Sequence, residues 1–515
     1  MLFEKNTLLK NRYGCILKAQ IRKSIYKNPQ KETAYGYSTT VGRKKRCQDR
    51  IKGILYDYIK INTTIGFHKQ QVLVNNKSKV LQRWVMREKY ESLALSDLKE
   101  IAKSRGIKGV AAMRKAEVVE SMLAEDEKNR ISTEKIHVEL DSGVEAHGIL
   151  EVLPDGYGFI RCANYLPGDN DVYVAPSQIR RFNLKTGDII EGNTRVKTQA
   201  EKFSALLYVK RINGLNPIEA EKRTSFEDMT PIFPNSRLRL EIPGAPVSMR
   251  IMDLMSPVGK GQRGMIVSPP KAGKTTLLKE VAKSLQQNNP EIHLIILLID
   301  ERPEEVTDIR EAISGKNVEV IYSTFDELPE HHKRVSEMVI ERAKRLVEHK
   351  KDVVILLDSI TRLTRAYNLT VPPSGRTLSG GLDPAALHMP KRFFGAARNM
   401  REGGSLTVLA TALVETGSKM DDVVYEEFKG TGNMEMVLDR KLSEKRVFPA
   451  IDIPKSGTRR EDLLLDAEEL EAINIMRKAL NGMKADEAVE KILDMFVRTR
   501  DNREFVEMVK KIKLL

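Results

Sequence analysis

A short segment, Gly264–Thr276, restricts the fold of this chain more than its composition does. An apolar stretch leads into Ser268-Pro-Pro-Lys-Ala-Gly-Lys-Thr275, and a helical pattern follows over 277–285. A strand, a turn and a helix in this order are typical of the phosphate loop G-x-x-x-x-G-K-[ST], and only Ser268, at the first glycine position, departs from it. We therefore expect an α/β domain in which this loop follows a strand.

The loop contains three groups that a nucleotide site needs. Gly273 lets backbone N–H groups close round the phosphates at a helix N-terminus. Lys274 neutralises β- and γ-phosphate oxygens, and the Thr275 hydroxyl is suited to ligate Mg²⁺. For this motif alone, an accidental Gly-Lys-Thr at the start of a helix is the alternative.

Two apolar runs further along the chain each lead to an acidic residue. Val353–Leu357 is followed by Asp358, which is suited to hold Mg²⁺ through its water shell. Ile292–Ile299 leads to Glu301, which could polarise an attacking water, and to Arg302, which could lie near the γ-phosphate. Such acids also occur as plain caps, but three elements in this order predict an ATPase of the RecA type that uses ATP and Mg²⁺.

The chain before this domain shows two other patterns. From Ser96, the expected N-cap, apolar residues recur at helical spacing, and Lys and Glu then dominate 125–135, which indicates a linker. From His147 to Val209, short alternating strands and turn tripeptides predict a small β-barrel. The sequence thus predicts a multidomain protein, with an α/β RecA-like ATPase core preceded by a small helical module and an OB/cold-shock-like β-barrel. The expected segments are a basic extension of unknown fold (1–85), the helical module with its linker (86–135), the barrel (136–215), a connector (216–240) and the ATPase domain (241–515).

Several classes of protein are excluded by composition. No apolar run reaches the roughly 18 residues of a membrane-spanning helix, and Glu4 and Lys5 interrupt the only apolar stretch near the terminus, which argues against a signal peptide. The three cysteines, Cys15, Cys47 and Cys162, are too few and too scattered for a disulfide framework or a metal site. We therefore expect a cytoplasmic protein without a membrane partner.

Beyond the separate motifs, the chain resembles the Rho family of transcription termination factors. The resemblance is seen in Ser268–Thr275 with its altered first position, in Leu298–Glu305 (LIDERPEE) and in Leu357–Tyr367 (LDSITRLTRAY). It continues through 391–398, 425–433 and 446–450 and covers essentially residues 90–515. It implies an ATP-dependent 5′-to-3′ translocase and helicase on single-stranded RNA, which works as a homohexamer and disengages transcripts from RNA polymerase.

The resemblance also implies roles in the ATP site. Glu301 would be the catalytic base, assisted by Arg302 and Lys274, and Phe448 would stack on adenine. Arg459 looks like the arginine finger that reaches a neighbouring subunit's γ-phosphate, although an Arg after Gly-Thr is by itself usually a solvated loop residue. The expected ATP-binding residues are Lys271, Ala272, Gly273, Lys274, Thr275, Thr276 and Phe448, with Thr275 and Asp358 at Mg²⁺.

In the expected barrel, Tyr157, Phe159 and Arg161 alternate along one strand face, while Ile160 points to the core. Aromatic side chains that stack on bases, with an Arg for phosphates or base edges, are how such barrels hold single strands. The spacing alone leaves ordinary core aromatics as an alternative. The same alternation points Tyr173 outward. Similarity to cold-shock and Rho RNA-binding barrels carries over Tyr157, Phe159, Arg161 and Tyr173 as RNA contacts, and adds Phe203, which stands where the Rho family often has Tyr. It also implies a preference for pyrimidines, especially cytosine.

Two loops, Val371–Gly381 and Thr416–Lys419, resemble the central-channel loops of the Rho family. Their Gly and Ser content suits mobile loops, although such loops more often serve only as connections. The RNA contacts implied here are Arg376, Thr377, Ser379 and Lys419.

The net charge of +15 is confined to residues 1–85, which hold nineteen Lys and Arg against four acidic residues. The remaining chain is formally neutral, so the overall charge is no evidence for nucleic-acid binding by it. Two hypotheses stay open for 1–85. We favour a segment that is not translated natively, with the true start near Met86, because the resemblance begins only beyond it. The other is a basic arm that adds sequence-independent RNA affinity.

Three other functions compete with the Rho interpretation. A RecA-type motor on DNA or a rotary ATP synthase subunit would share the nucleotide elements but would lack this barrel with two channel loops. A protein of another class, an RNA-binding regulator with a vestigial ATPase, would not need Lys274, Glu301, Asp358 and Arg459 to be intact.

Overall fold

The computed structural model describes residues 86–87, 90–91, 93–199, 201–480 and 485–511, and the extension 1–85 lies outside them. The chain forms two compact units, divided between Glu134 and Lys135. In the described part of the chain, no helix is both long and apolar enough to cross a membrane.

The helical module consists of α4 (Leu95–Ser104), a short 3-10 helix η1 (Val110–Ala112) and α5 (Lys115–Leu140). Leu98, Val118 and Met122 are buried in its core. Two expectations are corrected. The N-cap of α4 is Ala94, without a side-chain cap, and Ser96 lies inside the helix. The expected linker, 125–135, is continuous helix within α5, because Lys and Glu are good helix formers.

The predicted barrel is present as five strands closed in the order β1-β2-β3-β5-β4. They are β1 (Asp141–Val152), β2 (Gly158–Arg161), β3 (Val172–Val174), β4 (Ile189–Arg195) and β5 (Ser204–Ile212), with α6 (Pro176–Arg181) after β3. Alternate residues fill the interior, among them Ile160, Val172 and Val174. Gly148 allows β1 to approach β2 closely, because a Cβ there would lie 2.3 Å from the Arg161 carbonyl oxygen.

The connector contains short elements of regular secondary structure. It contains α7 (Pro217–Ala220), η2 (Phe226–Asp228) and β6 (Pro231–Ile232). β6 pairs antiparallel with β11 (Arg398–Met400), which in turn pairs with β12 (Ser405–Leu413). The end of the connector is therefore part of the ATPase sheet.

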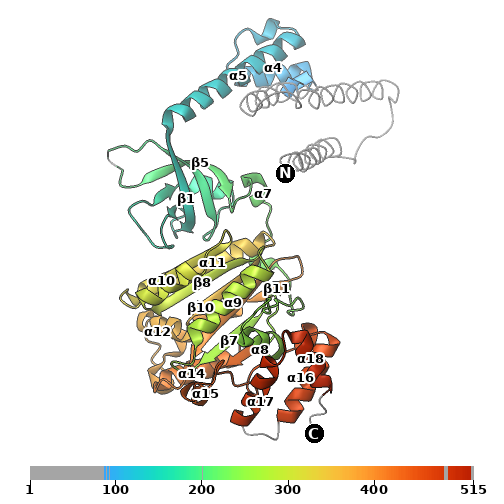
Figure 1. The fold of residues 1–515 in the computed structure, drawn as a ribbon. Helices are drawn as coiled ribbons and strands as arrows, with labels where there is room; N and C mark the ends of the chain where they lie inside the picture. The colour runs from blue at the N-terminus through green and yellow to red at the C-terminus, as the bar shows by residue number, and fades with distance from the viewer. Residues whose placement is uncertain (1–85, 88–89, 92, 200, 481–484, 512–515) are drawn as a thin grey trace, which may run out of the picture. The chain divides into compact units, whose positions relative to one another are not determined.

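The ATPase domain is built on a mostly parallel sheet with helices packed against it (Figure 1). The strand order of this sheet is β14-β13-β7-β12-β10-β8-β9. Besides β12, the strands in this order are β7 (Arg263–Ser268), β8 (His293–Glu301), β9 (Val318–Thr324), β10 (Asp352–Asp358), β13 (Met434–Val437) and β14 (Gly457–Thr458). The helices of the domain are α8 (Val247–Met255), α9 (Lys274–Asn288), α10 (Pro303–Ala312), α11 (Pro329–Glu348), α12 (Ile360–Thr370), α13 (His388–Gly395), α14 (Lys419–Lys429), α15 (Arg440–Glu444), α16 (Ala467–Leu480), α17 (Ala485–Val497) and α18 (Asn502–Lys511).

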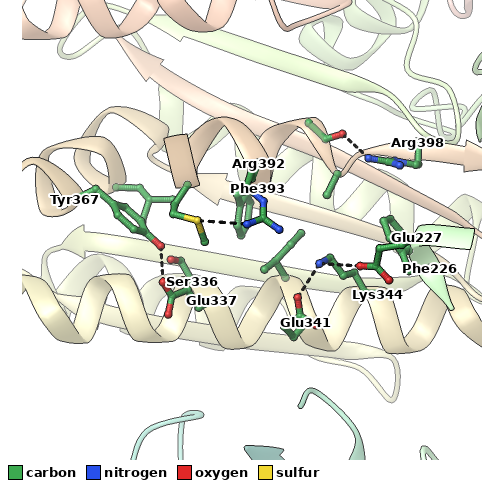
Figure 2. Close-up of a pocket in the computed structure, with 15 residues that line it drawn as sticks. Phe226, Glu227, Ser336, Glu337, Glu341, Lys344, Tyr367, Arg392, Phe393 and Arg398 are labelled. Atoms are coloured by element: carbon green, nitrogen blue, oxygen red, sulfur yellow. Dashed lines mark hydrogen bonds and ion pairs between the residues drawn. The ribbon is translucent and has the colours of Figure 1, made fainter. Parts of the chain in front are cut away.

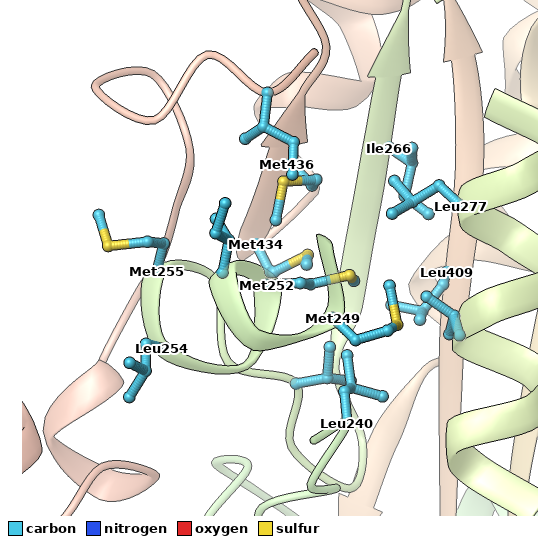
Figure 3. Packing of buried hydrophobic residues seen from close by; sticks show 14 of the residues in the cluster. Leu240, Met249, Met252, Leu254, Met255, Ile266, Leu277, Leu409, Met434 and Met436 are labelled. Carbon is cyan, nitrogen blue, oxygen red and sulfur yellow. The ribbon is translucent and has the colours of Figure 1, made fainter. Parts of the chain in front are cut away.

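Both faces of this sheet are buried. Along β8, Leu294, Ile296 and Leu298 enter one hydrophobic cluster, and the intervening residues Ile295 and Leu297 enter the other. This explains why the parallel strands read as continuous apolar runs rather than alternating ones. In the first cluster, methionines of α8 and β13 pack beside Ile266 and Leu277 (Figure 3). The packing holds β7 and the start of α9 firmly on either side of the phosphate loop.

Candidate nucleotide site and RNA-binding surfaces

The phosphate loop joins β7 to α9, as the sequence predicts. Ser268 is buried, and its hydroxyl donates to the Pro269 carbonyl at 2.9 Å. Gly273, the N-cap of α9, has a φ of 93°, a conformation that favours glycine, and a Cβ there would meet nothing within 4 Å. The loop therefore presents free backbone at a helix N-terminus, where phosphates bind well. Of the other expected ATP contacts, Lys271 and Thr276 are exposed, Thr275 is half-buried and Ala272 is buried.

Lys274 joins the two acids that the sequence analysis singled out. Its Nζ donates to Oε1 of Glu301 at 2.9 Å and to Oδ1 of Asp358 at 2.6 Å. β8 and β10 are neighbouring parallel strands, so their carboxyl ends meet at one edge of the sheet. The phosphate loop leaves the same edge from β7, which is parallel to them and is separated from β10 by β12. The structure therefore brings together residues that are 84 positions apart at most in the sequence.

Two residues of this site were missed by sequence reasoning. Arg362, in the first turn of α12, lies 3.2 Å from Oε2 of Glu301 and also donates to the Asp300 carbonyl. Thr411, near the end of β12, donates its hydroxyl proton to Oδ1 of Asp358 at 2.7 Å. Two sequence signals could have indicated these residues. Arg362 follows Asp358 by four positions, and Thr411 is a hydroxyl residue inside an apolar run.

The electrostatics of this cluster suit a base beside a fixed cation. Burial raises the pKa of Glu301, and repulsion from Asp358 adds to this, although Lys274 and Arg362 oppose it. Burial acts to lower the pKa of Lys274, but the attraction of Asp358 and Glu301 outweighs it, so this pKa is raised. Lys274 therefore remains protonated, while Glu301 is a better proton acceptor than an ordinary carboxylate.

The oxygen groups near the loop fit a magnesium ion. Asp358 is 1% exposed and has its carboxylate fixed by Thr411 and Lys274. Thr275 supplies a hydroxyl from the first turn of α9. Carboxylate and hydroxyl oxygens, together with phosphate oxygens and waters, are the ligands that Mg²⁺ prefers.

The helix α15, which precedes Phe448 in the chain, contacts the phosphate loop. The Ser443 hydroxyl donates to the Lys271 carbonyl at 2.8 Å. Five residues later, Phe448 is 52% exposed. A half-exposed ring is compatible with stacking on adenine, which remains a prediction.

The two predicted arginines lie in different places. Arg302 is the N-cap of α10, with a 68% exposed side chain 4.0 Å from Glu305. Arg459 follows β14, where Thr458 is in register with Met434 of β13 and, through it, with Gly264 near the beginning of β7. The phosphate loop leaves the other end of β7, so Arg459 lies away from its own loop. It lines an open groove of about 510 Å³.

A separate cavity of about 320 Å³ lies among η2, α11, α12 and α13 (Figure 2). None of the predicted site residues lines it. Two of its polar groups are already paired, Lys344 with Glu341 at 2.7 Å and the Tyr367 hydroxyl with Glu337 at 3.0 Å. The cavity therefore adds nothing to the nucleotide site.

On the barrel, four aromatic residues form one cluster, which we call the aromatic platform: Tyr157, Phe159, Tyr173 and Phe203. Their ring centroids lie 5.1 to 6.0 Å apart. All four rings are partly exposed, whereas Ile160 beneath them is completely buried. The platform is therefore a surface feature supported by the core, as stacking on bases requires.

Arg161 belongs to this surface but is not free. Its guanidinium lies 4.9 Å from the centroid of Phe159 and is only 6% exposed. Glu151 of β1 and Asp171 both bind it. This geometry favours a role in fixing Phe159 and the edge of the platform over a free phosphate grip, and neither acid was singled out from the sequence.

The two expected channel loops touch each other. Gly380 has a φ of 76°, and a Cβ there would lie 2.4 Å from the backbone nitrogen of Met420. Lys419 begins α14, which is anchored by Arg365 through a bidentate ion pair with buried Asp421. The other expected RNA contacts in these loops, Arg376, Thr377 and Ser379, are exposed, as is Lys419.

Comparison with known families assigns all three parts of the chain. Residues 89–129 match the Rho termination factor N-terminal domain, and residues 146–218 match the Rho termination factor RNA-binding domain. Residues 248–458 match the nucleotide-binding domain of the ATP synthase alpha/beta family.

Full-length relatives give the same result. The transcription termination factor Rho of Pseudomonas aeruginosa is 53% identical over 422 residues, which cover 81% of this chain and 97% of that protein. The Rho protein of Aquifex aeolicus is 51% identical over 443 residues, which cover 85% of this chain and 99% of that protein. The Rho protein of Bacillus subtilis is 52% identical over 420 residues, which cover 81% of this chain and 95% of that protein.

Proposed function

Because this chain belongs to the transcription termination factor Rho family, we propose that it terminates transcription by hydrolysing ATP to move 5′ to 3′ along single-stranded RNA. The strongest support for this function is that one chain contains both a candidate nucleotide site and a candidate RNA-binding surface. The Lys274–Glu301–Asp358 cluster follows a phosphate loop, and an aromatic platform lies on a separate barrel. An RNA-binding regulator with a vestigial ATPase would have no need for the first.

In the ATP site, the residues of this chain divide the chemistry. The loop backbone and Lys274 hold the phosphates, Glu301 orients and polarises the attacking water, and Arg362 keeps Glu301 in place. Thr275 and Asp358 would hold Mg²⁺, which supplies charge neutralisation on the phosphates when bound. Phe448 would stack on adenine.

Arg459 supports a ring of identical subunits. It lies away from its own phosphate loop, so it can assist hydrolysis only at a nucleotide bound by another copy. A homohexamer provides such neighbours all round, with Arg302 near the γ-phosphate of its own subunit.

RNA would bind first on the platform and then in the channel. The platform offers rings on which successive bases can stack, and Arg161 fixes one of these rings, Phe159, from behind. The preference for pyrimidine-rich, especially C-rich, RNA is proposed from membership of the Rho family. In the channel, Arg376, Thr377, Ser379 and Lys419 would hold the strand that hydrolysis pulls, so that the transcript leaves the RNA polymerase elongation complex. We place this activity in the cytoplasm.

ATP hydrolysis with different nucleic acids tests the proposal. The rate should be low without nucleic acid and strongly stimulated by poly(C), with poly(U) and single-stranded DNA less effective. Equal stimulation by DNA would instead favour a motor on another nucleic acid. RNA binding without any stimulated hydrolysis would favour the regulator.

A further inference from the structure

Among the contacts between the barrel and the ATPase domain, one leads to the aromatic platform. Arg334 of α11 donates from one nitrogen to both carboxylate oxygens of Glu151, at 2.7 Å each. The same Glu151 carboxylate accepts from Arg161 at 2.7 Å. Arg161 in turn binds Asp171 and lies over the Phe159 ring. An uninterrupted series of contacts therefore runs from an ATPase helix to a platform ring.

The charges in this series balance only when Arg334 is included. Glu151 and Asp171 are two carboxylates with side chains 15% and 2% exposed, and Arg161 alone would leave them one negative charge in excess. An excess negative charge under a surface that binds a polyanion is unfavourable. Arg334 supplies the missing positive charge and holds Glu151 in the orientation that Arg161 uses.

We propose that Arg334, a residue of the ATPase domain, is a positioning residue for the RNA site of the barrel, acting through Glu151 and Arg161 on Phe159. The inference rests on the proposed RNA binding at the platform. It means that the barrel's affinity for RNA depends partly on its attachment to α11. Conversely, RNA bound on the platform must stabilise this attachment, because coupling of binding free energies is reciprocal.

The test measures binding of a fluorescent oligocytidine to the full-length protein without ATP, over a series of salt concentrations. Arg334→Gln should weaken binding about three- to tenfold, within the range for groups in contact, and Arg334→Lys should restore part of it. The slope of log affinity against log salt should not change, because Arg334 acts through Glu151 rather than on phosphate. In a Glu151→Gln background, Arg334→Gln should have almost no effect.

Three outcomes would overturn the proposal: unchanged affinity in Arg334→Gln, an equal loss in the Glu151→Gln background, or a slope reduced by about 0.7. The last would show that Arg334, whose side chain is 37% exposed, contacts phosphate directly. The matched control is Tyr165→Phe, which removes another bond between barrel and ATPase domain, the one from the Tyr165 hydroxyl to Glu319, and should leave affinity unchanged. If Tyr157→Ala also leaves affinity unchanged, the RNA site itself has been misplaced, and the proposed function of the barrel fails first.

Discussion

The Nζ of Lys274 lies 2.6 Å from Oδ1 of Asp358, at the end of β10. The lysine belongs to the loop that would hold phosphates, and the aspartate to the pair of oxygens that would hold Mg²⁺. Their contact brings the loop and the end of β10 together in one cluster. Glu301, the proposed base, binds the same lysine at 2.9 Å.

Glu301→Gln should separate binding from hydrolysis. The phosphate loop, Lys274 and Asp358 remain, so ATP affinity should be retained, whereas poly(C)-stimulated hydrolysis should fall by about 10²- to 10⁴-fold. A fluorescent ATP analogue and a steady-state phosphate assay measure the two quantities. Glu304→Gln, at an exposed position of α10, is the matched control and should behave as wild type. Near-normal turnover of Glu301→Gln would remove Glu301 from the role of base.

The pH dependence of hydrolysis should reflect the environment of Glu301. A base must be ionised to accept a proton, and burial with repulsion from Asp358 raises the pKa of Glu301. Activity should therefore be lost as the pH falls through a value above the usual carboxyl range. The profile of kcat/KM for ATP at saturating poly(C) measures this, because it reports groups of the free enzyme. An acid limb in the ordinary carboxyl range would contradict the prediction.

The sequence predicted those parts of the site that follow from local order. A strand, a turn and a helix fix the phosphate loop, and parallel strands put their terminal acids at one edge, so Lys274, Glu301 and Asp358 could be placed together in advance. Thr411 could not, because its contact depends on β12 lying beside β10, and strand order has no local signature.

In the barrel too, contacts between different strands could not be predicted from the local sequence. Period-two alternation correctly separated the platform face from Ile160. The partners of Arg161 depend on the register of β1 against β2 and on the loop before β3, so the burial of its charge was not foreseen. The expectation of a linker at 125–135 is wrong for a different reason. The many charges of this segment indicate a solvated linker, but Lys and Glu are also good helix formers, and the segment is helical.

Arg459→Ala should act on neighbouring subunits. The pure variant should bind ATP but hydrolyse it slowly, because the γ-phosphate charge is not stabilised. In mixtures with wild-type protein, activity should fall more steeply than the wild-type fraction, since each variant subunit also silences a neighbour's site. Arg460→Ala is the matched control, because the adjacent Arg460 is exposed and pairs with Asp462. Activity in simple proportion to the wild-type fraction would exclude action in trans.

Replacing Tyr157 and Phe159 by Ala should weaken poly(C) binding by about 2–6 kcal/mol, from about 1–3 kcal/mol for each stacked base. Folding should survive, because both rings are partly exposed. Binding titrations and thermal melting of the full-length protein measure the two effects. Tyr208→Phe, which removes a 3.4 Å hydrogen bond to Asp141, is the control on β5. Unchanged affinity with a lowered melting temperature would identify the rings as core residues.

Lys419→Ala should spare RNA binding on the barrel and abolish RNA-stimulated hydrolysis. Lys419 is exposed at the first position of α14, and Gly380 of the other loop lies against the next residue, Met420. In the proposed channel, Lys419 and Arg376 would both contact the RNA strand, and loss of the Lys419 contact to phosphate would uncouple RNA from ATP turnover. Poly(C) affinity without ATP and the poly(C)-stimulated rate separate the two sites. Lys316→Ala, an exposed lysine before β9, should change neither quantity. A loss of poly(C) affinity in Lys419→Ala would place Lys419 in the primary RNA site instead.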